Sequence, residues 1–316
     1  MRKYLISFPL SSTESWQSVF SITLLQKQVS STIYAGEPKF GKVQAVKGIS
    51  FAVYPGELLA LLAPNGSGKT TTLSLMLGGR KPDRGEIRLF GLDPRQPQAR
   101  LRVGVTPQET NFPWTLRVEE IIELVNGHFP QPLKVEELAT RFDLSEIMHR
   151  QTGGLSGGQR RKLALALAFA GGPDIVFLDE PTVGLDVEVR MRLWQEVRKY
   201  LQGRGTVVLT THYLEEAEAL ATRVLIMNKG QVIDEGSVEE IKGRVGLKHV
   251  RFRASHLPEL ADLAVLERAE DRYTGYVQDA DALVRSLVQH NVDFHGLEIL
   301  PATLEEAFLQ MTGETK

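Results

Sequence analysis

The chain has 316 residues, enough for about two domains. Hydrophobic residues make up 42% and charged residues 24%, which excludes a largely disordered chain, and the net charge of −2 disfavours a dedicated nucleic-acid-binding protein, which is normally basic. The absence of cysteine excludes disulfides, thiolate catalysis and cysteine-ligated metal sites.

Residues 1–20 are expected to form an extension without regular structure. Their short apolar run gives way to polar residues from Ser11 onward, too early for the hydrophobic segment of a secretory signal. Elsewhere, the apolar runs Leu58–Ala63 and Leu163–Ala170 fall well short of the about 20 residues that a membrane-spanning helix needs. We therefore expect a chain that does not cross a membrane by itself.

Residues 21–243 combine short apolar runs with segments of helical periodicity, a pattern typical of βαβ units around a largely parallel sheet. Three runs predict buried strands: Leu58–Leu62, Ile175–Leu178 and Thr206–Leu209. A polar, glycine-rich or charged segment follows each of them. Because ligands bind at the carboxyl ends of strands in such sheets, these three segments mark the expected site.

Between about residues 112 and 171 the strand signal gives way to helical spacing. Val118, Ile121, Ile122 and Val125 fall on one face of a predicted helix. This pattern predicts a helical subdomain inserted between segments of the sheet.

The last part of the chain, residues 244–316, has a different pattern. Alternation at His249–Arg253 and Tyr273–Val277 predicts strands, and the period of Asp281–His290 predicts a helix. A capping box at Thr303–Glu306 begins a last helix. We expect a small α+β domain here, and the sequence leaves open whether it regulates, aids dimerisation or binds another molecule.

A candidate phosphate-binding loop follows the first strand and precedes a predicted helix, Thr71–Leu77. Gly66 and Gly68 would let backbone amides turn toward phosphate at a helix N-terminus. Lys69 could reach the β- and γ-phosphates, and the Thr70 hydroxyl could bind Mg²⁺. A glycine-rich turn without a ligand is the alternative, but it does not account for the adjacent lysine and threonine. The candidate residues are Ala63, Pro64, Asn65, Gly66, Ser67, Gly68, Lys69, Thr70 and Thr71.

The first position of this loop is unusual, because Ala63 stands where the pattern G-x-x-x-x-G-K-[ST] has glycine. If the position needs a positive φ, alanine costs about 1 kcal/mol or more. If it needs only a small side chain, alanine is nearly neutral. The sequence leaves both alternatives open.

The other two strands end in groups that suit phosphate chemistry. Asp179 and Glu180 follow the second strand, where the first could hold Mg²⁺ and the second could polarise a water molecule for in-line attack. His212 follows the third strand and could contact the γ-phosphate or that water. By themselves, these residues could be an acidic surface loop and a surface histidine without a function. Because a phosphate loop is present in the same chain, together they predict one site.

The five-residue segment Leu155–Gln159, with the sequence Leu-Ser-Gly-Gly-Gln, precedes another helical run. Ser156, Gly157 and Gly158 would leave backbone amides exposed at the N-terminus of that helix, which makes a second anion site. One chain thus carries two phosphate-binding ends and one evident nucleotide loop. Two chains could pair so that each loop meets the second site of the other.

Taken together, these motifs resemble the ATP-binding subunit of an ATP-binding cassette (ABC) transporter over residues 21–243. The resemblance rests on Asn65–Thr70 (Walker A), Gln108 (Q-loop), Leu155–Gln159 (signature), Ile175–Glu180 (Walker B and catalytic glutamate), Gly184–Asp186 (D-loop) and His212 (switch histidine). Phe40 falls where the family stacks an aromatic ring, often tyrosine, on adenine. The closing segment Pro301–Leu309 is similar to the tail of the ABC-2 and drug-resistance exporter branch.

The resemblance implies an α/β fold: a P-loop NTPase (RecA-like) core with an inserted helical subdomain and a small C-terminal α+β domain. It also implies an ATPase that uses ATP and Mg²⁺ in a head-to-tail dimer, more readily a homodimer than a heterodimer. The partner would be a separate transmembrane permease that carries out export, with the chain peripheral at the cytoplasmic face of the membrane. No nucleic acid is expected.

The resemblance also assigns roles to individual residues. Glu180, His212 and Gln108 would be catalytic, and Thr70, Gln108 and Asp179 would bind the metal. The nucleotide would contact Phe40, the phosphate loop, Gly157, Gln159 and Asp186, and Ser156 and Gly158 of the other chain would complete the cradle.

Two other functions are the alternatives. A soluble ABC ATPase acting on nucleic acid or ribosomes would carry a long coiled coil or a second cassette, and the chain has neither. A catalytically silent regulatory cassette would have lost site residues, whereas Lys69, Asp179, Glu180 and His212 are intact.

Overall fold

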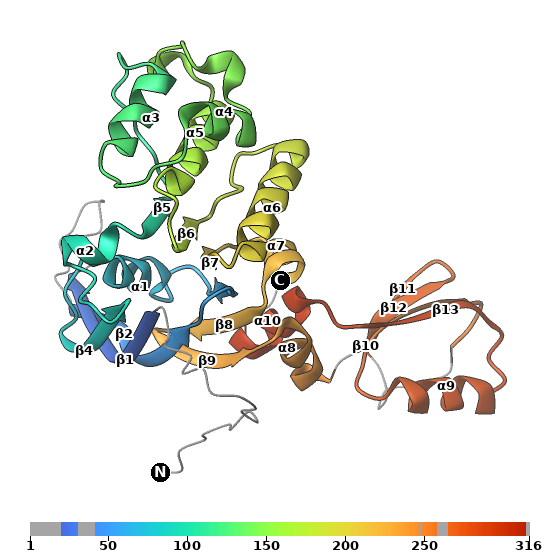
Figure 1. Cartoon of the computed structure of the whole chain (residues 1–316). Helices are drawn as coiled ribbons and strands as arrows, with labels where there is room; N and C mark the ends of the chain where they lie inside the picture. Colours follow the sequence, from blue (N-terminus) through green and yellow to red (C-terminus); the bar gives the residue numbers. More distant parts are fainter. Residues whose placement is uncertain (1–19, 31–41, 247, 258–264, 314–316) are drawn as a thin grey trace, which may run out of the picture.

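The computed structural model describes residues 20–30, 42–246, 248–257 and 265–313. Figure 1 shows a larger part organised by two sheets and a smaller part organised by a third. In the described residues, no helix is both long enough and apolar enough to cross a membrane.

A six-stranded sheet forms the centre of the larger part. Its spatial order is β5 (Val103–Thr106), β6 (Ile175–Asp179), β7 (Thr206–Thr210), β3 (Leu58–Leu62), β8 (Arg223–Asn228) and β9 (Gln231–Gly236). The first five are parallel, and β9 is antiparallel to β8. Strands β3, β6 and β7 confirm the three predicted strands, and β6 and β7 are each one residue longer than expected.

A three-stranded antiparallel sheet, which the sequence analysis did not predict, covers one face of the central sheet. Its order is β2 (Lys42–Val53), β1 (Phe20–Ser30) and β4 (Arg84–Leu89). Phe20 meets Phe177 of β6 edge-on, with ring centroids 6.4 Å apart. The pairing of β1 with β2 and β4 contains register shifts, which interrupt the two-residue alternation by which such strands are predicted.

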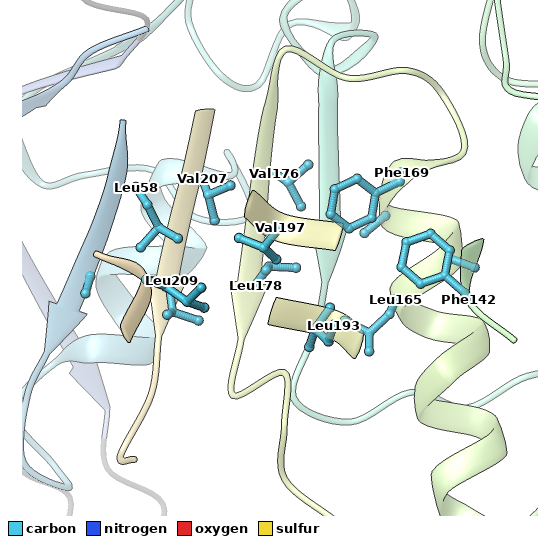
Figure 2. Packing of buried hydrophobic residues seen from close by; sticks show 14 of the residues in the cluster. Leu58, Phe142, Leu165, Phe169, Val176, Leu178, Leu193, Val197, Val207 and Leu209 are labelled. Atoms are coloured by element: carbon cyan, nitrogen blue, oxygen red, sulfur yellow. The ribbon is translucent and has the colours of Figure 1, made fainter. Parts of the chain in front are cut away.

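Helices cover the other face of the central sheet. They are α5 (Gly157–Phe169), α6 (Val187–Gln202), α7 (Leu214–Leu220) and α8 (Val238–Val245). Figure 2 shows the contact, in which Leu165, Phe169, Leu193 and Val197 of α5 and α6 pack with Val176, Leu178, Val207 and Leu209 of the sheet. Burying one such side chain contributes roughly 1.5–3 kcal/mol, so this packing fixes the strand ends that carry the site.

Helices α3 (Val118–Asn126), α4 (Val135–Arg141) and α5 follow one another between β5 and β6. Two short 3₁₀ turns, Ser145–Ile147 and Thr152–Gly154, connect α4 to α5. Val118, Ile121 and Ile122, which were predicted to share one face, are buried in the same core as α5. A further short helix, α2 (Pro97–Arg100), precedes β5.

Within its described residues, the smaller part is a four-stranded antiparallel sheet with one helix, α9 (Ala280–Gln289). The order of its strands is β11 (Val265–Ala269), β12 (Arg272–Val277), β10 (Lys248–Ala254) and β13 (Phe294–Pro301). Phe252, Tyr273 and Leu287 belong to its separate hydrophobic core.

The last helix, α10 (Leu304–Thr312), begins at the predicted capping box but packs on the larger part. Leu304, Ala307 and Phe308 belong to the core that includes Ile241 of α8, and Figure 1 shows the two helices side by side. The domain boundary expected between residues 243 and 244 assigns α10 to the small domain. The apolar face of this helix instead lies in the core of the larger part. An amphipathic pattern does not specify which core a helix will cover.

Candidate active site

The carboxyl ends of four neighbouring parallel strands form one edge of the central sheet. Strand β3 leads into the glycine-rich loop, β6 ends at Asp179, β7 leads to His212, and β5 leads to Gln108. The parallel pairing places these four segments beside one another, as expected for a sheet of this class.

The glycine-rich loop turns tightly between β3 and α1 (Lys69–Met76). Gly66 and Gly68 have φ values of 77° and 99°, in the region that favours glycine. A Cβ atom on Gly68 would also lie 2.2 Å from the carbonyl oxygen of Ala45, so no other residue fits there without a shift of the backbone. The loop therefore presents the N-terminus of α1, where exposed amides favour phosphate.

The structure decides between the two alternatives for Ala63. This residue is 7% exposed and packs in the core beneath the antiparallel sheet. It is not among the described non-glycine residues with positive φ. The position therefore needs a small side chain and not a glycine conformation, and alanine meets that need.

Glu180 lies at the centre of the cluster and is 5% exposed. Its Oε1 atom is 3.0 Å from Nζ of Lys69, the lysine of the loop. Its Oε2 atom accepts a hydrogen bond from the backbone N–H of His212 at 3.3 Å and also contacts Nδ1 of that ring. Three of the predicted site residues thus meet at one buried carboxylate.

The backbone of Glu180 is strained, with a φ of 50°. The left-handed region costs a residue other than glycine roughly 1–2 kcal/mol. Such residues persist where surrounding contacts hold them, and they are concentrated at functional sites.

Asp179, one residue earlier, accepts a hydrogen bond from the hydroxyl of Thr210 on β7. Burial raises the pKa of the Asp179 carboxyl, and the hydrogen bond from Thr210 opposes that effect. The contact between Lys69 and Glu180 brings their sequence neighbours, Thr70 and Asp179, to the same end of the sheet. A hydroxyl and a carboxylate are oxygen ligands of the kind that Mg²⁺ binds in nucleotide sites, so this donor set fits the ion.

A cavity of about 500 Å³ lies over the loop. Besides loop residues, Gln44, Ala45, Lys47 and Lys229 line it, and the sequence analysis had singled out none of these. Two of them add positive charge beside Lys69, which favours a polyphosphate. They reach the cavity from β2 and from the turn between β8 and β9, elements far from the loop in sequence.

The segment Ser156–Gln159 does not line this cavity. Ser156 is the N-cap of α5: its hydroxyl accepts a hydrogen bond from the N–H of Gln159 at 3.2 Å, and the Gln159 side chain accepts one from Ser156 N–H. Cβ atoms on Gly157 and Gly158 would meet nothing within 4 Å. This helix end is therefore ordered and open toward solvent.

Two other predicted site residues make no described side-chain contact with the cluster. Asp186 caps the N-terminus of α6 by accepting a hydrogen bond from Val189 N–H at 2.9 Å. Gln108 is exposed on the loop after β5, and no described hydrogen bond joins its side chain to Glu180. Phe40 lies outside the described residues.

Two buried charged residues beside the cluster were not predicted from the sequence. Arg161 of α5 donates hydrogen bonds to the loops after β5 and β6. Glu216 of α7 is 1% exposed and accepts hydrogen bonds from Trp194 Nε1 at 3.2 Å and Thr182 at 3.3 Å. Burial raises the pKa of the Glu216 carboxyl. Only their position near the motifs in sequence could have drawn attention to them.

Comparison with known proteins shows to which family the chain belongs. The model of the ABC transporter family matches residues 46–183. The Nod factor export ATP-binding protein I of Ralstonia nicotianae is 35% identical over 293 residues, which cover 87% of this chain and 91% of that protein. The daunorubicin resistance ATP-binding protein DrrA3 of Streptomyces coeruleorubidus is 32% identical over 309 residues, 90% of this chain and 96% of its own.

Solved structures show the same fold. An ATP-binding subunit of an ABC transporter has a TM-score of 0.63 and 24% identity, covering 72% of this chain and 94% of its own. A dimeric ATP-binding cassette in a post-hydrolysis state, bound to ADP and Pi, has a TM-score of 0.61 and 24% identity over 69% of this chain and 98% of its own. With the relatives above, these findings identify the chain as a member of the ABC transporter family, an ATP-binding subunit that hydrolyses ATP.

Proposed function

We propose that this subunit energises export through a separate membrane-spanning permease, with its ATPase site divided between two copies of the chain. The observation that carries the proposal is the convergence of Lys69, Glu180 and His212 beside a cavity that lacks the segment Ser156–Gln159. The phosphate loop, Glu180 and His212 thus meet in one chain, whereas Ser156–Gln159 does not line the cavity over that loop.

Within one chain, Lys69 and the amides of the loop would bind the β- and γ-phosphates, and Phe40 would stack on adenine. Thr70 and Asp179, with Gln108, would hold the Mg²⁺ ion, whose charge offsets that of the phosphates. Glu180 would take the proton of the attacking water, and His212 would orient the glutamate and contact the γ-phosphate. The buried position of Glu180 suits this role, because electrostatic interactions strengthen away from bulk water.

Across the interface, the exposed N-terminus of α5 would complete the site of the partner chain. Ser156–Gln159 present helix amides and a hydroxyl to solvent, and Asp186 lies at the start of another helix. A head-to-tail pair buries both segments against phosphate loops. A homodimer suffices, because each chain contains both halves of the site, and the dimeric cassettes of similar fold support this arrangement.

The permease would dock on the groove beside the Q-loop. This groove, of about 460 Å³, is lined by Glu109–Phe112, Trp114, Thr152, Gly153 and Arg160. Trp114 is 80% exposed, which suits an aromatic anchor for a partner segment. Docking there would hold the chain at the cytoplasmic face of the membrane. Similarity to a Nod factor export ATP-binding protein and to a daunorubicin resistance ATP-binding protein supports export as the direction of transport.

Affinity purification of the tagged chain from gently solubilised membranes of its host tests this proposal. We expect a multi-span protein to co-purify in stoichiometric amount, and Trp114→Ala to reduce its recovery. Leu124→Ala is the matched control, because it truncates an exposed side chain on α3, within the same inserted helical subdomain but outside the groove. It should leave the recovery unchanged. Recovery of the chain only with soluble partners such as ribosomes or nucleic acid would contradict the proposal.

A further inference from the structure

Arg161 of α5 is a buried charge that forms no direct ion pair with a carboxylate of the described residues. The residue is 8% exposed, and none of the described ion pairs includes its guanidinium. Burial lowers the pKa of Arg161, while the nearby carboxylates of Asp179, Glu180 and Glu216 oppose that effect. A buried cation is costly unless its donors are satisfied, so its hydrogen bonds show what holds it there.

All five of its described hydrogen bonds go to backbone carbonyl groups. Nε donates to Pro181 at 3.0 Å, and Nη2 donates to Asp179 at 2.7 Å and to Glu180 at 2.5 Å. Nη1 donates to Pro107 at 2.6 Å and to Gln108 at 3.2 Å. One guanidinium therefore joins two segments, 107–108 after β5 and 179–181 at the end of β6, to α5, the helix that Ser156 caps.

These contacts account for the strained backbone of Glu180. Three consecutive carbonyl oxygens, those of residues 179–181, converge on one cation at the point where the φ of Glu180 is 50°. The same turn aims the Glu180 carboxylate at Lys69 and His212. Removing the guanidinium would take the shared donor from these three carbonyl groups and leave the turn to its remaining bonds, such as the one that Glu180 N–H donates to Thr210 at 2.9 Å.

We propose that Arg161 is a positioning residue for ATP hydrolysis: it holds the Glu180 turn in its left-handed conformation and ties that turn to the Gln108 loop and to helix α5. It touches no substrate atom and acts through the backbone of Glu180. The inference rests on the proposed role of Glu180 as the base. Arginine is required because its planar fork offers five N–H donors, whereas lysine offers three from a single atom.

The test compares Arg161→Gln and Arg161→Lys with a matched control, Lys162→Gln, which removes the next cation of the same helix and its exposed contact with Asp143. Steady-state ATPase is measured with the full chain, together with MgATP binding. We expect kcat of Arg161→Gln to fall about tenfold to a hundredfold, the effect of a misplaced catalytic group, and the KM for ATP to change less than about threefold. Arg161→Lys should lose less, and the control should stay within about twofold of wild type.

Combining each substitution with Glu180→Gln separates positioning from a general effect on folding. If Arg161 acts through Glu180, Arg161→Gln should cause no further loss of single-turnover hydrolysis once Glu180 is already replaced. A loss that multiplies in the Glu180→Gln background, or a normal kcat in Arg161→Gln, would overturn the inference. If Arg161→Gln does not fold, Arg161→Lys takes its place. The same two results are then required: a lower kcat by itself, and no further loss when it is combined with Glu180→Gln. Normal hydrolysis by Glu180→Gln alone would instead contradict the proposed function.

Discussion

Lys69 and Glu180 are 111 residues apart in the chain, yet Nζ of the first lies 3.0 Å from Oε1 of the second. The pair joins the phosphate loop after β3 to the acidic turn after β6, across the intervening strand β7. Both side chains are largely buried, so the contact defines where the two loops meet. The group that would bind phosphate and the group that would activate water are therefore already aligned.

Replacing Glu180 with glutamine keeps its size and removes its charge. We expect MgATP binding to persist, because the loop and Lys69 are untouched, and kcat to fall by about a hundredfold or more, as for the loss of a general base. Binding is measured by titration with a fluorescent ATP analogue, and hydrolysis by release of phosphate. Near-normal turnover in Glu180→Gln would remove this carboxylate from the role.

Replacing Ala63 with glycine restores the usual first residue of the loop. Because Ala63 is buried and has no positive φ, we expect no gain in ATP affinity. The free energy of unfolding should fall by about 0.5–1 kcal/mol, the entropic cost of adding a glycine. Urea unfolding and ATP titration of the two proteins check both parts, and an affinity increase of tenfold would show that alanine weakens the loop.

Gly68 and Gly66 provide a matched pair of substitutions to alanine. Both have positive φ, but only at position 68 would the new Cβ collide with a backbone oxygen. We expect Gly68→Ala to lower ATP affinity by about tenfold or more, and Gly66→Ala to have a clearly smaller effect, since strain without collision is the milder change. Equal losses in the two variants would show that the contact with Ala45 does not matter.

Glu216 should make stability depend on pH. Burial raises its pKa in the folded protein above the unfolded value, so its stabilising effect is full below the unfolded pKa and is lost as pH rises through the raised one. Glu216→Gln lacks this titration. The free energy of unfolding of wild type minus that of the variant should therefore increase as the pH falls from neutral toward about 4.5, the ordinary value of a glutamate. Glu215→Gln, exposed on the same helix, is the control, and a pH-independent difference for Glu216→Gln would contradict the expectation.

The sequence predicted the sheet and the core of the site because both depend on local patterns. Strands buried on both faces, such as Leu58–Leu62, are continuous apolar runs, and the residues that follow them must lie at one edge of a parallel sheet. The motif around Lys69 needs only a strand before it and a helix after it. These signals lie within a few residues of the positions that they predict.

Features that depend on distant contacts were not predicted. The antiparallel sheet of β1, β2 and β4 has shifted registers, and the apolar face of α10 lies in the core of the larger part. In the sequence, Arg161 is indistinguishable from a solvent-exposed charge on a helix, because the carbonyl oxygens that it contacts lie up to 54 residues away. Lys229 reaches the cavity only through the turn between β8 and β9.

Mixing two inactive variants tests the divided ATPase site most directly. Lys69→Ala disables the phosphate loop and Ser156→Arg blocks the N-terminus of α5, so neither chain alone should hydrolyse ATP. In a head-to-tail dimer the mixed pair contains one intact site, and an equal mixture should recover about a quarter of wild-type activity. A mixture that stays inactive, or a Ser156→Arg chain that hydrolyses ATP normally by itself, would contradict the divided site.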